Sequence, residues 1–177
     1  LWLAPGYNTP GNLADRLVAR GFADLGGGLS MLLVRDPRDD RPRLIPAGAT
    51  VERVTATALP DGGRTAALEA ARVISQAFGV TGHRRPALEA ELVAGLAVPE
   101  VEVRLVRIDG EAVAVGRRHA FDGMSYLSAI GVRPDWRGGR LGELVARSLI
   151  DGALADGHEL IHLSVHTTNG PARAMYG

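Results

Sequence analysis

A ten-residue stretch, PDWRGGRLGE at 134–143, combines glycine with arginine between two different kinds of element. An apolar run, YLSAIGV, precedes it, and an amphipathic pattern, LGELVARSLIDGALADG, follows it. Glycine lets a backbone approach another group closely, and the first turn of a helix points unpaired N–H groups outward. The stretch therefore predicts a site where main-chain N–H groups hold an anion.

Three anion-binding motifs compete for this loop. A P-loop requires G-x-x-x-x-G-K-[ST], and the lysine and hydroxyl residue are absent. A dinucleotide fingerprint requires G-x-G-x-x-G near a first strand, which neither the spacing nor the position matches, so a Rossmann protein is a distant alternative. The third is a pyrophosphate held by consecutive backbone N–H groups at a helix start, with no metal.

The elements that would position this loop follow from hydrophobic periodicity and turn residues. Alternating patterns predict strands, amphipathic patterns predict helices, and the dipeptide Asp109-Gly110 favours a tight hairpin. Several antiparallel strands followed by a strand–helix–strand unit predict an α/β protein with a mixed, mostly antiparallel sheet flanked by helices. The expected order is strand 50–56, helices 65–78 and 87–96, strands 101–109, 111–120 and 124–132, helix 141–156, strand 159–167 and a last helix from 169.

Composition narrows the possible functions. The chain has 177 residues, 46% of them hydrophobic and 23% charged, which is an ordinary globular balance. Its formal net charge is zero, so a general attraction to nucleic acid or to an acidic membrane has no support. It has no cysteine, no apolar run near the ~18 residues that span a bilayer and no signal pattern. We expect a soluble, cytoplasmic protein.

Three histidines near the end of the chain, His158, His162 and His166, raise the question of a metal site. On a strand, His162 and His166 would share a face, but about 13 Å would separate them, so they could not hold one ion together. Histidines in a strand more often lie at an edge or in the core. We therefore expect no metal.

The region around the loop resembles the acyl-CoA-binding motif of the GNAT N-acetyltransferase superfamily, [QR]-x-x-G-x-[GA] after a strand that ends in valine. In IGVRPDWRGGRLGELVARSL, Arg137 matches its first position and Gly142 its last. Arg140 departs from the commoner glycine, and its side chain would crowd a phosphate unless it points away. The end of the chain, NGPARAMY, resembles a later motif, N-x-x-A-x-x-[LM]-Y, with Asn169, Ala172, Met175 and Tyr176 in register.

The resemblance implies the GNAT acyl-CoA N-acyltransferase fold and an acetyl-CoA-dependent N-acetyltransferase. Such an enzyme moves an acetyl group to a primary amine by direct attack, and Tyr176 would give its phenolic proton to the leaving sulfur. Tyr126 and Ser128 would lie on the acceptor side, where several relatives carry a base. Neither is a good base unaided, because a phenol titrates near ~10. The implied cofactor-binding residues are Ile130, Val132, Arg137, Gly138, Gly139, Arg140, Leu141, Gly142 and Asn169.

Other interpretations stay open. Asn169 could cap the last helix, contact the cofactor, or do both. A non-catalytic acyl-CoA-binding or scaffolding module is the alternative to an enzyme. The acceptor would be a small-molecule or peptide amine, which the sequence does not specify, and a homodimer is left open. His119 and Asp122 are interpreted as strand-edge and turn residues.

The chain divides into an N-terminal segment, 1–47, and a GNAT domain, 48–177, whose C-terminal end we expect to be truncated. The N-terminal segment is expected to contain a strand, a short helix over 13–18, a strand over 30–35 and a linker around 36–48. It resembles the tail of a degenerate GNAT domain, with no tyrosine at 17 or 18. It could alternatively supply edge strands to the second domain, or be a plain extension.

Overall fold

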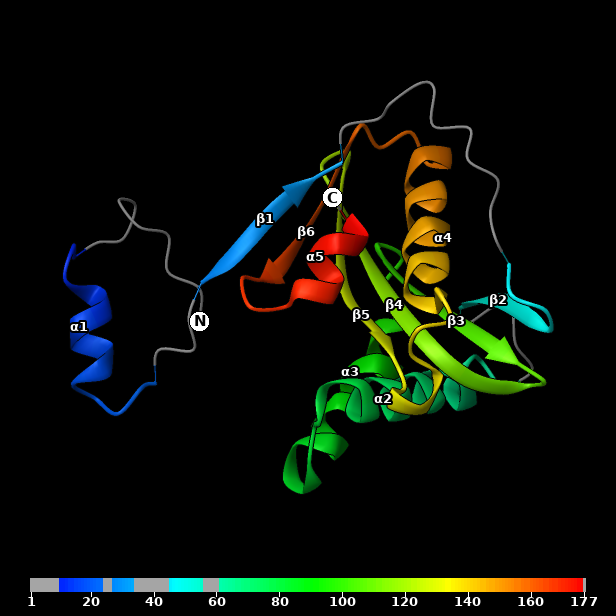
Figure 1. Cartoon of the computed structure of the whole chain (residues 1–177), viewed down its shortest axis with the longest axis horizontal. Coiled ribbons are helices and arrows are strands. Elements are labelled where there is room, and N and C mark those ends of the chain that lie inside the picture. Colours follow the sequence, from blue (N-terminus) through cyan, green and yellow to red (C-terminus); the bar gives the residue numbers. More distant parts are fainter. Residues whose placement is uncertain (1–9, 24–26, 34–44, 56–60, 177) are drawn as a thin grey trace.

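A six-stranded sheet forms the centre of the molecule, with its strands in the order β1-β6-β5-β4-β3-β2 (Figure 1). The computed structural model of the chain describes residues 10–23, 27–33, 45–55 and 61–176. Only β5 and β6 are parallel, and every other neighbouring pair is antiparallel. The predicted mixed, mostly antiparallel sheet is confirmed. The strands are β1 Gly28–Leu32, β2 Ala49–Val54, β3 Val101–Ile108, β4 Glu111–Phe121, β5 Met124–Val132 and β6 Leu160–His166.

Helices cover both faces of the sheet. Adjacent residues of β3 point to opposite faces, so Leu105 packs with Val73 of α2 and Val106 packs with Val145 of α4. One face thus lies under α2 and α3 and the other under α4, and α5 packs on the α4 side through Tyr176. The helices are α1 Leu13–Val18, α2 Arg64–Phe78, α3 Arg85–Gly95, α4 Leu141–Ala155 and α5 Gly170–Tyr176, with short 3₁₀ turns at Gly82–Arg84 and Pro134–Trp136.

Turn residues explain the β3–β4–β5 meander. Asp109 and Gly110 have φ values of 51° and 84°, and Asp122 and Gly123 have φ values of 46° and 73°. Two successive positive φ values are what a two-residue hairpin turn of the primed type requires. The hairpin predicted at Asp109-Gly110 is confirmed.

The start of α3 is a correction to the sequence interpretation. The helix was expected from Ala87, with Pro86 as part of the break before it, but it begins at Arg85. Proline fits the first turn of a helix because the N–H that it lacks would have no helical partner there. Pro86 therefore belongs to the helix rather than to the loop.

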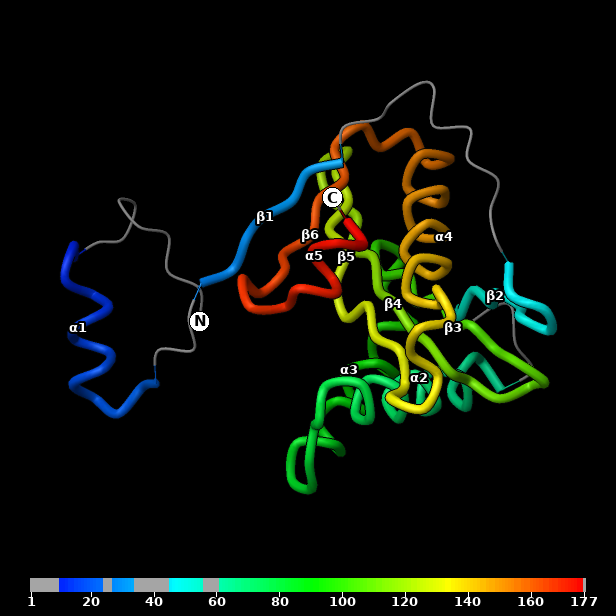
Figure 2. The backbone as a smooth tube through the Cα atoms, in the orientation of Figure 1, coloured from blue at the N-terminus to red at the C-terminus, as the bar shows by residue number. Residues whose placement is uncertain are grey.

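The N-terminal segment reaches the sheet through β1. This strand pairs antiparallel with β6, from Gly28 opposite His166 to Leu32 opposite His162, as the edge-strand interpretation expects. Helix α1 has no buried residue and stands apart from the sheet and its helices (Figure 2). The strand expected before α1 and most of the linker lie in 1–9 and 36–44, outside the described residues. No helix in the described parts of the chain is long and apolar enough to cross a bilayer.

Candidate functional site

The two parallel strands β5 and β6 pair over only part of their length. Their register runs from Met124 opposite Leu160 to Leu127 opposite Leu163, and it ends there although both strands continue. The two strands diverge beyond this point (Figure 1). Residues 128–132 of β5 thus have no partner strand on the β6 side among the described residues. We call this unpaired stretch between β5 and β6 the opening; its β5 side is backbone with hydrogen-bonding groups that no neighbouring strand takes up.

A β-bulge lies where this opening begins. Val115 of β4 stands opposite Gly131 and Arg117 stands opposite Ser128, so Gly116 alone faces Ala129 and Ile130. Ala129 has a φ of 50°, which marks the extra residue. A Cβ at Gly116 would lie 2.8 Å from Leu149 Cδ1, so glycine is needed for α4 to pack over the bulge.

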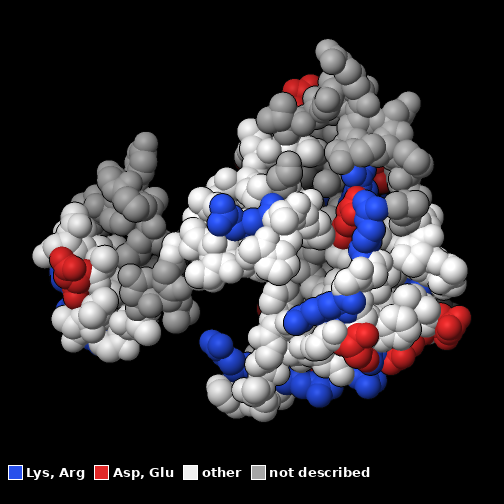
Figure 3. Space-filling model, in the orientation of Figure 1, with Lys and Arg blue, Asp and Glu red and all other residues white. Residues whose placement is uncertain are grey.

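The glycine–arginine loop joins the end of β5 to the start of α4. Gly138 has a φ of 84°, and Arg140, the residue before the helix, has a φ of 57°. The helix begins at Leu141, so the N–H groups of its first turn have no helical acceptors and carry the positive end of the helix dipole. On the face shown in Figure 3, basic side chains lie in several separate groups, with acidic groups beside some of them. The surroundings of the loop suit an anion.

The side chain of Arg140 is held along the first turn of the helix. Its Nε donates to Glu143 Oε2 at 2.8 Å and its Nη2 donates to Oε1 at 3.0 Å. Burial alone would raise the pKa of Glu143, but hydrogen bonds from Arg140 and Arg147 outweigh it and leave that pKa below its usual range. The Arg140 side chain is therefore tied to a carboxylate on α4.

Two contacts fix the loop against α2. Arg137 Nη2 donates to the carbonyl oxygen of Ala77 at 3.0 Å, in the last turn of that helix. Gly131, at the end of β5, lies so close to α2 that a Cβ there would be 2.8 Å from Ala77 Cβ and from a ring carbon of Phe78. The loop thus sits where the ends of β5 and α2 meet the start of α4.

Helix α5 packs beside the same first turn of α4. A Cβ at Gly142 would lie 3.3 Å from Met175 Sδ and 3.5 Å from Val132 Cγ2, so this glycine makes room for α5. Asn169 caps α5, because its Oδ1 accepts the N–H of Ala172 at 3.2 Å. The capping interpretation of Asn169 is confirmed.

Tyr176 lies against the apolar cluster at the point where the strands part. The cluster includes Leu127 and Leu163, the last paired residues of β5 and β6, and it lies on the α4 side of the sheet. Burial raises the pKa of Tyr176 to about 12. The phenol therefore keeps its proton at neutral pH and is available as a donor.

Aromatic and imidazole rings gather at the same level on the opposite face. Tyr126 stands opposite His119 on β4 and opposite His162 on β6, with ring centroids 6.3 and 5.0 Å away. Phe121 lies edge-on to His162, with centroids 6.2 Å apart. Ser128 stands opposite Arg117 on this face. The two predicted acceptor-side residues thus share a face with two histidines that sequence reasoning did not place there.

Arg117 links this face to α3. Its Nη1 donates to Glu91 Oε1 at 2.7 Å and its Nη2 donates to His119 Nε2 at 3.2 Å. Burial, followed by the charge of Arg117, lowers the pKa of His119 below its usual range. His119 is therefore neutral at pH 7 and its acceptor nitrogen is already occupied.

The model of the acetyltransferase (GNAT) family matches residues 75–177, more than half of the chain. The chain belongs to the GNAT acetyltransferase family. The match begins within α2 and includes the bulge, the glycine–arginine loop and α5.

Solved structures share the GNAT fold of this chain. The ribosomal-protein-S18-alanine N-acetyltransferase of Escherichia coli is 19% identical, with a TM-score of 0.59 over 72% of this chain and 74% of that one. PaiA N-acetyltransferase of Thermoplasma acidophilum, solved with coenzyme A, is 11% identical, with a TM-score of 0.58 over 72% and 86%. The aminoglycoside N-acetyltransferase AAC(6′)-Iy, also solved with coenzyme A, is 15% identical, with a TM-score of 0.59 over 74% and 87%. No curated protein sequence matches the chain.

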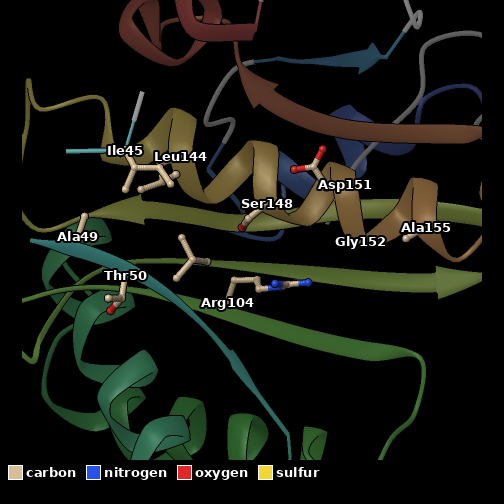
Figure 4. Close-up of a pocket in the computed structure, with 10 residues that line it drawn as sticks. Ile45, Ala49, Thr50, Arg104, Leu144, Ser148, Asp151, Gly152 and Ala155 are labelled. Carbon is tan, nitrogen blue, oxygen red and sulfur yellow. The ribbon is translucent and has the colours of Figure 1, made fainter. Parts of the chain in front are cut away.

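This GNAT chain also has a cavity away from the opening, with a volume of about 570 Å³, between α4 and the β2–β3 edge of the sheet (Figure 4). Arg104 lines it from the sheet side and Ser148 from the helix side, and it contains no predicted site residue. The carboxylate of Glu102, 2% exposed, forms ion pairs with Arg104, with Arg53 at 3.5 Å and with Arg118 at 2.7 Å. The charges in this part of the acetyltransferase are largely paired with one another.

The three histidines near the end of this GNAT chain have different surroundings. His158 Nδ1 is hydrogen-bonded to Ser125 Oγ at 2.7 Å and His166 Nδ1 to Thr168 Oγ1 at 2.8 Å, whereas His162 belongs to the rings around Tyr126. Within the described ranges of this GNAT chain, no group of three or more histidine or acidic side chains is placed to hold a metal ion.

Proposed function

We propose that this acetyltransferase uses acetyl-CoA to acetylate a primary amine by direct attack. The observation that carries the proposal is that β5 and β6 part after Leu127 and Leu163, beside the glycine–arginine start of α4. Two similar folds were solved with coenzyme A, and the names of all three relatives describe N-acetyltransferases. The acceptor class is a small-molecule or peptide amine.

The cofactor would lie along the opening. Free N–H groups from Gly138 to Glu143 would hold the pyrophosphate, with charge from Arg137 and Arg140 nearby. The edge backbone of Ile130 and Val132 would pair with the amides of the pantetheine arm, which is extended like a strand. The site fits a phosphate group, because the ion pair with Glu143 directs the Arg140 side chain along the helix.

The remaining cofactor contacts would come from the same loop and from α5. Asn169 uses Oδ1 as the helix cap, and its Nδ2 is left to contact pantetheine. The first-turn residues Leu141 and Gly142 contribute backbone rather than side chain, and so does Gly139. The small size of Gly142 keeps α5 close to this turn.

The acetyl transfer would use residues on both faces of the sheet. The amine nitrogen attacks the acetyl carbonyl carbon, a C–N bond forms and the C–S bond breaks. Tyr176, still protonated because burial raises its pKa to about 12, gives its proton to the sulfur. Tyr126 and Ser128, on the face toward α3, would line the acceptor side.

We also propose that residues 48–177 form the catalytic domain and that residues 1–47 derive from a second GNAT unit. The pairing of β1 with β6 supports a structural role for this segment at the edge of the sheet. A shortened chain that starts at Ile45 is expected to bind acetyl-CoA more weakly, because the β6 edge next to the opening loses its partner strand.

The experiment is a turnover assay with acetyl-CoA. The protein is incubated with acetyl-CoA and a panel of amines (an aminoglycoside, a polyamine, an arylalkylamine and a peptide with a free N-terminus), and release of free thiol is followed. At least one amine is expected to give thiol release that depends on both protein and amine. Binding of acetyl-CoA with no consumption for any amine would contradict an enzyme and leave a binding module.

A further inference from the structure

The rings of His119, Phe121, Tyr126 and His162 form one cluster, called here the ring cluster. Tyr126 and His162 are directly opposite each other in the parallel register, and the next pair, Leu127 and Leu163, is the last before the strands part. The ring cluster therefore lies one residue from the closed end of the opening. It is open to solvent on one side, since Phe121 is 43% exposed.

Tyr176 and the ring cluster lie on opposite faces of the sheet at this level. Tyr176 packs with Leu127 and Leu163 on the α4 side, whereas Tyr126, next to Leu127, points to the α3 side. A thioester that passes through the opening would therefore have a proton donor on one side and the ring cluster on the other. Direct attack can use this arrangement, because the amine adds to the carbonyl carbon from one face of the thioester while the proton donor reaches the sulfur from the other side.

Only one member of the ring cluster has an imidazole that is free to accept a proton. His119 already accepts a hydrogen bond from Arg117 at 3.2 Å. His162 is half-buried and contacts the rings of Tyr126 and Phe121, and its imidazole makes no hydrogen bond within the part of the chain that the structure describes. Its ring nitrogens are therefore available to an incoming amine.

The immediate neighbours of His162 are rings and an apolar residue. From β4 it faces Phe121, from β5 it faces Tyr126, and on β1 its partner in the register is the apolar Leu32. On the same face, Arg117 of β4 and Glu91 of α3 pair with each other at 2.7 Å.

We propose that His162 is a catalytic residue, the group that accepts the proton of the acceptor amine; this rests on the proposed acetyl transfer. As the C–N bond forms and the C–S bond breaks, the amine proton passes to an imidazole nitrogen of His162. The sulfur takes the proton of Tyr176. The imidazolium then returns a proton to the phenolate through solvent, so the products are the amide and the free thiol, and both side chains are restored.

The test is the pH dependence of kcat/KM for His162→Gln with the amine that the parent protein acetylates best. At pH 7 the variant is expected to lose about 10²–10⁴-fold in kcat/KM, the usual effect of a general base. Its affinity for acetyl-CoA is expected to stay within about twofold of the parent, which also reports a folded protein. The loss should shrink as pH rises, because hydroxide then becomes able to take the proton that the attacking nitrogen releases.

Two controls and a second variant keep the result specific. His166→Gln changes a histidine of the same strand whose ring is held by Thr168, and it should keep the pH profile of the parent. His119→Gln should also keep it, because that ring is already engaged by Arg117. The smaller substitution His162→Ala should lose activity and regain part of it when imidazole is added.

Each contrary outcome has a distinct meaning. A parent that turns over while His162→Gln keeps its rate and pH profile would overturn the assignment of His162 and leave the acetyltransferase proposal standing. A profile that changes in His119→Gln instead would also overturn it. A parent that consumes acetyl-CoA with no amine would overturn both.

Discussion

Two regions of this molecule, the cavity and the opening, differ in the groups that line them. The cavity beside α4 is lined by side chains, among them Arg104, and lies next to the paired charges of Glu102 and Arg118 (Figure 4). The opening beyond Leu127 and Leu163 has a wall of strand backbone and, at one end, the N–H groups of a helix start. An extended ligand that carries amides and phosphates needs backbone donors and acceptors more than volume. We therefore assign the cofactor to the opening and a structural role to the ion pairs beside the cavity.

The largest expected effect lies beside the cavity. Glu102→Ala should lower the free energy of unfolding by about 3–5 kcal/mol, because it removes the buried carboxylate that pairs with the buried guanidinium of Arg118. Urea unfolding measures the loss, and the protein that remains folded should bind acetyl-CoA as the parent does. Asp156→Ala is the control, since this partner of Arg118 is 48% exposed and should cost less than about 1 kcal/mol. If folded Glu102→Ala loses affinity for acetyl-CoA, the assignment of cofactor binding to the opening alone would be contradicted.

At the opening, Tyr176→Phe should lower kcat about 100-fold, since it removes the proton donor to the sulfur. Affinity for acetyl-CoA should not change, because the ring still fills the same apolar place. Burial raises the pKa of Tyr176 to about 12, so the phenol of the parent stays protonated below that pH. The parent should therefore show no loss of kcat from this group up to about pH 10. Unchanged kcat in the variant would remove Tyr176 from the chemistry.

A matched pair of substitutions in α4 compares the opening and the cavity directly. Gly142→Ala places a Cβ 3.3 Å from Met175 Sδ beside the loop and should weaken acetyl-CoA binding about tenfold, or ~1.4 kcal/mol. Gly152→Ala places a Cβ 3.1 Å from Arg104 Nη2 beside the cavity and should leave this affinity within about twofold. Both raise helix propensity by about 1 kcal/mol, so a difference in binding is not a difference in helix stability. Calorimetric titration gives both affinities.

The smallest effect is expected from filling the cavity. Ser148→Leu places an apolar side chain in a space of about 570 Å³ that already has apolar lining, including Leu144. It removes a hydrogen bond from Ser148 Oγ to the carbonyl oxygen of Val145 in the same helix. The affinity for acetyl-CoA should change less than about twofold by calorimetry. A large loss of affinity would show that the cavity takes part in binding.

Local sequence patterns predicted much of the fold. Asp109-Gly110 determines its own turn, the apolar spacing from Leu141 to Leu149 determines one helix face, and the glycine–arginine loop could be recognised from its neighbours alone. The order of the elements along the chain followed from the same local patterns. These features depend on residues that are near one another in the chain.

Features that join distant segments could not be predicted. The bulge at Ala129 lies opposite a glycine in β4, and the exact residue at which β5 and β6 part is defined only by their register. His162 was not considered as a base, because the sequence gives no sign that Tyr126 stands opposite it. The ion pair of Arg140 with Glu143 fixes the direction of the Arg140 side chain, and it likewise could not be predicted from the sequence.

Hydrogen exchange with and without acetyl-CoA tests the assignment of the opening most directly. Peptides that contain 128–132 and 138–143 should exchange several-fold more slowly with the cofactor bound, because their backbone N–H groups would then be hydrogen-bonded. Peptides that contain 148–155, beside the cavity, should exchange at the same rate in both states. Slower exchange at 148–155 with none at 128–132 and 138–143 would contradict the proposed site.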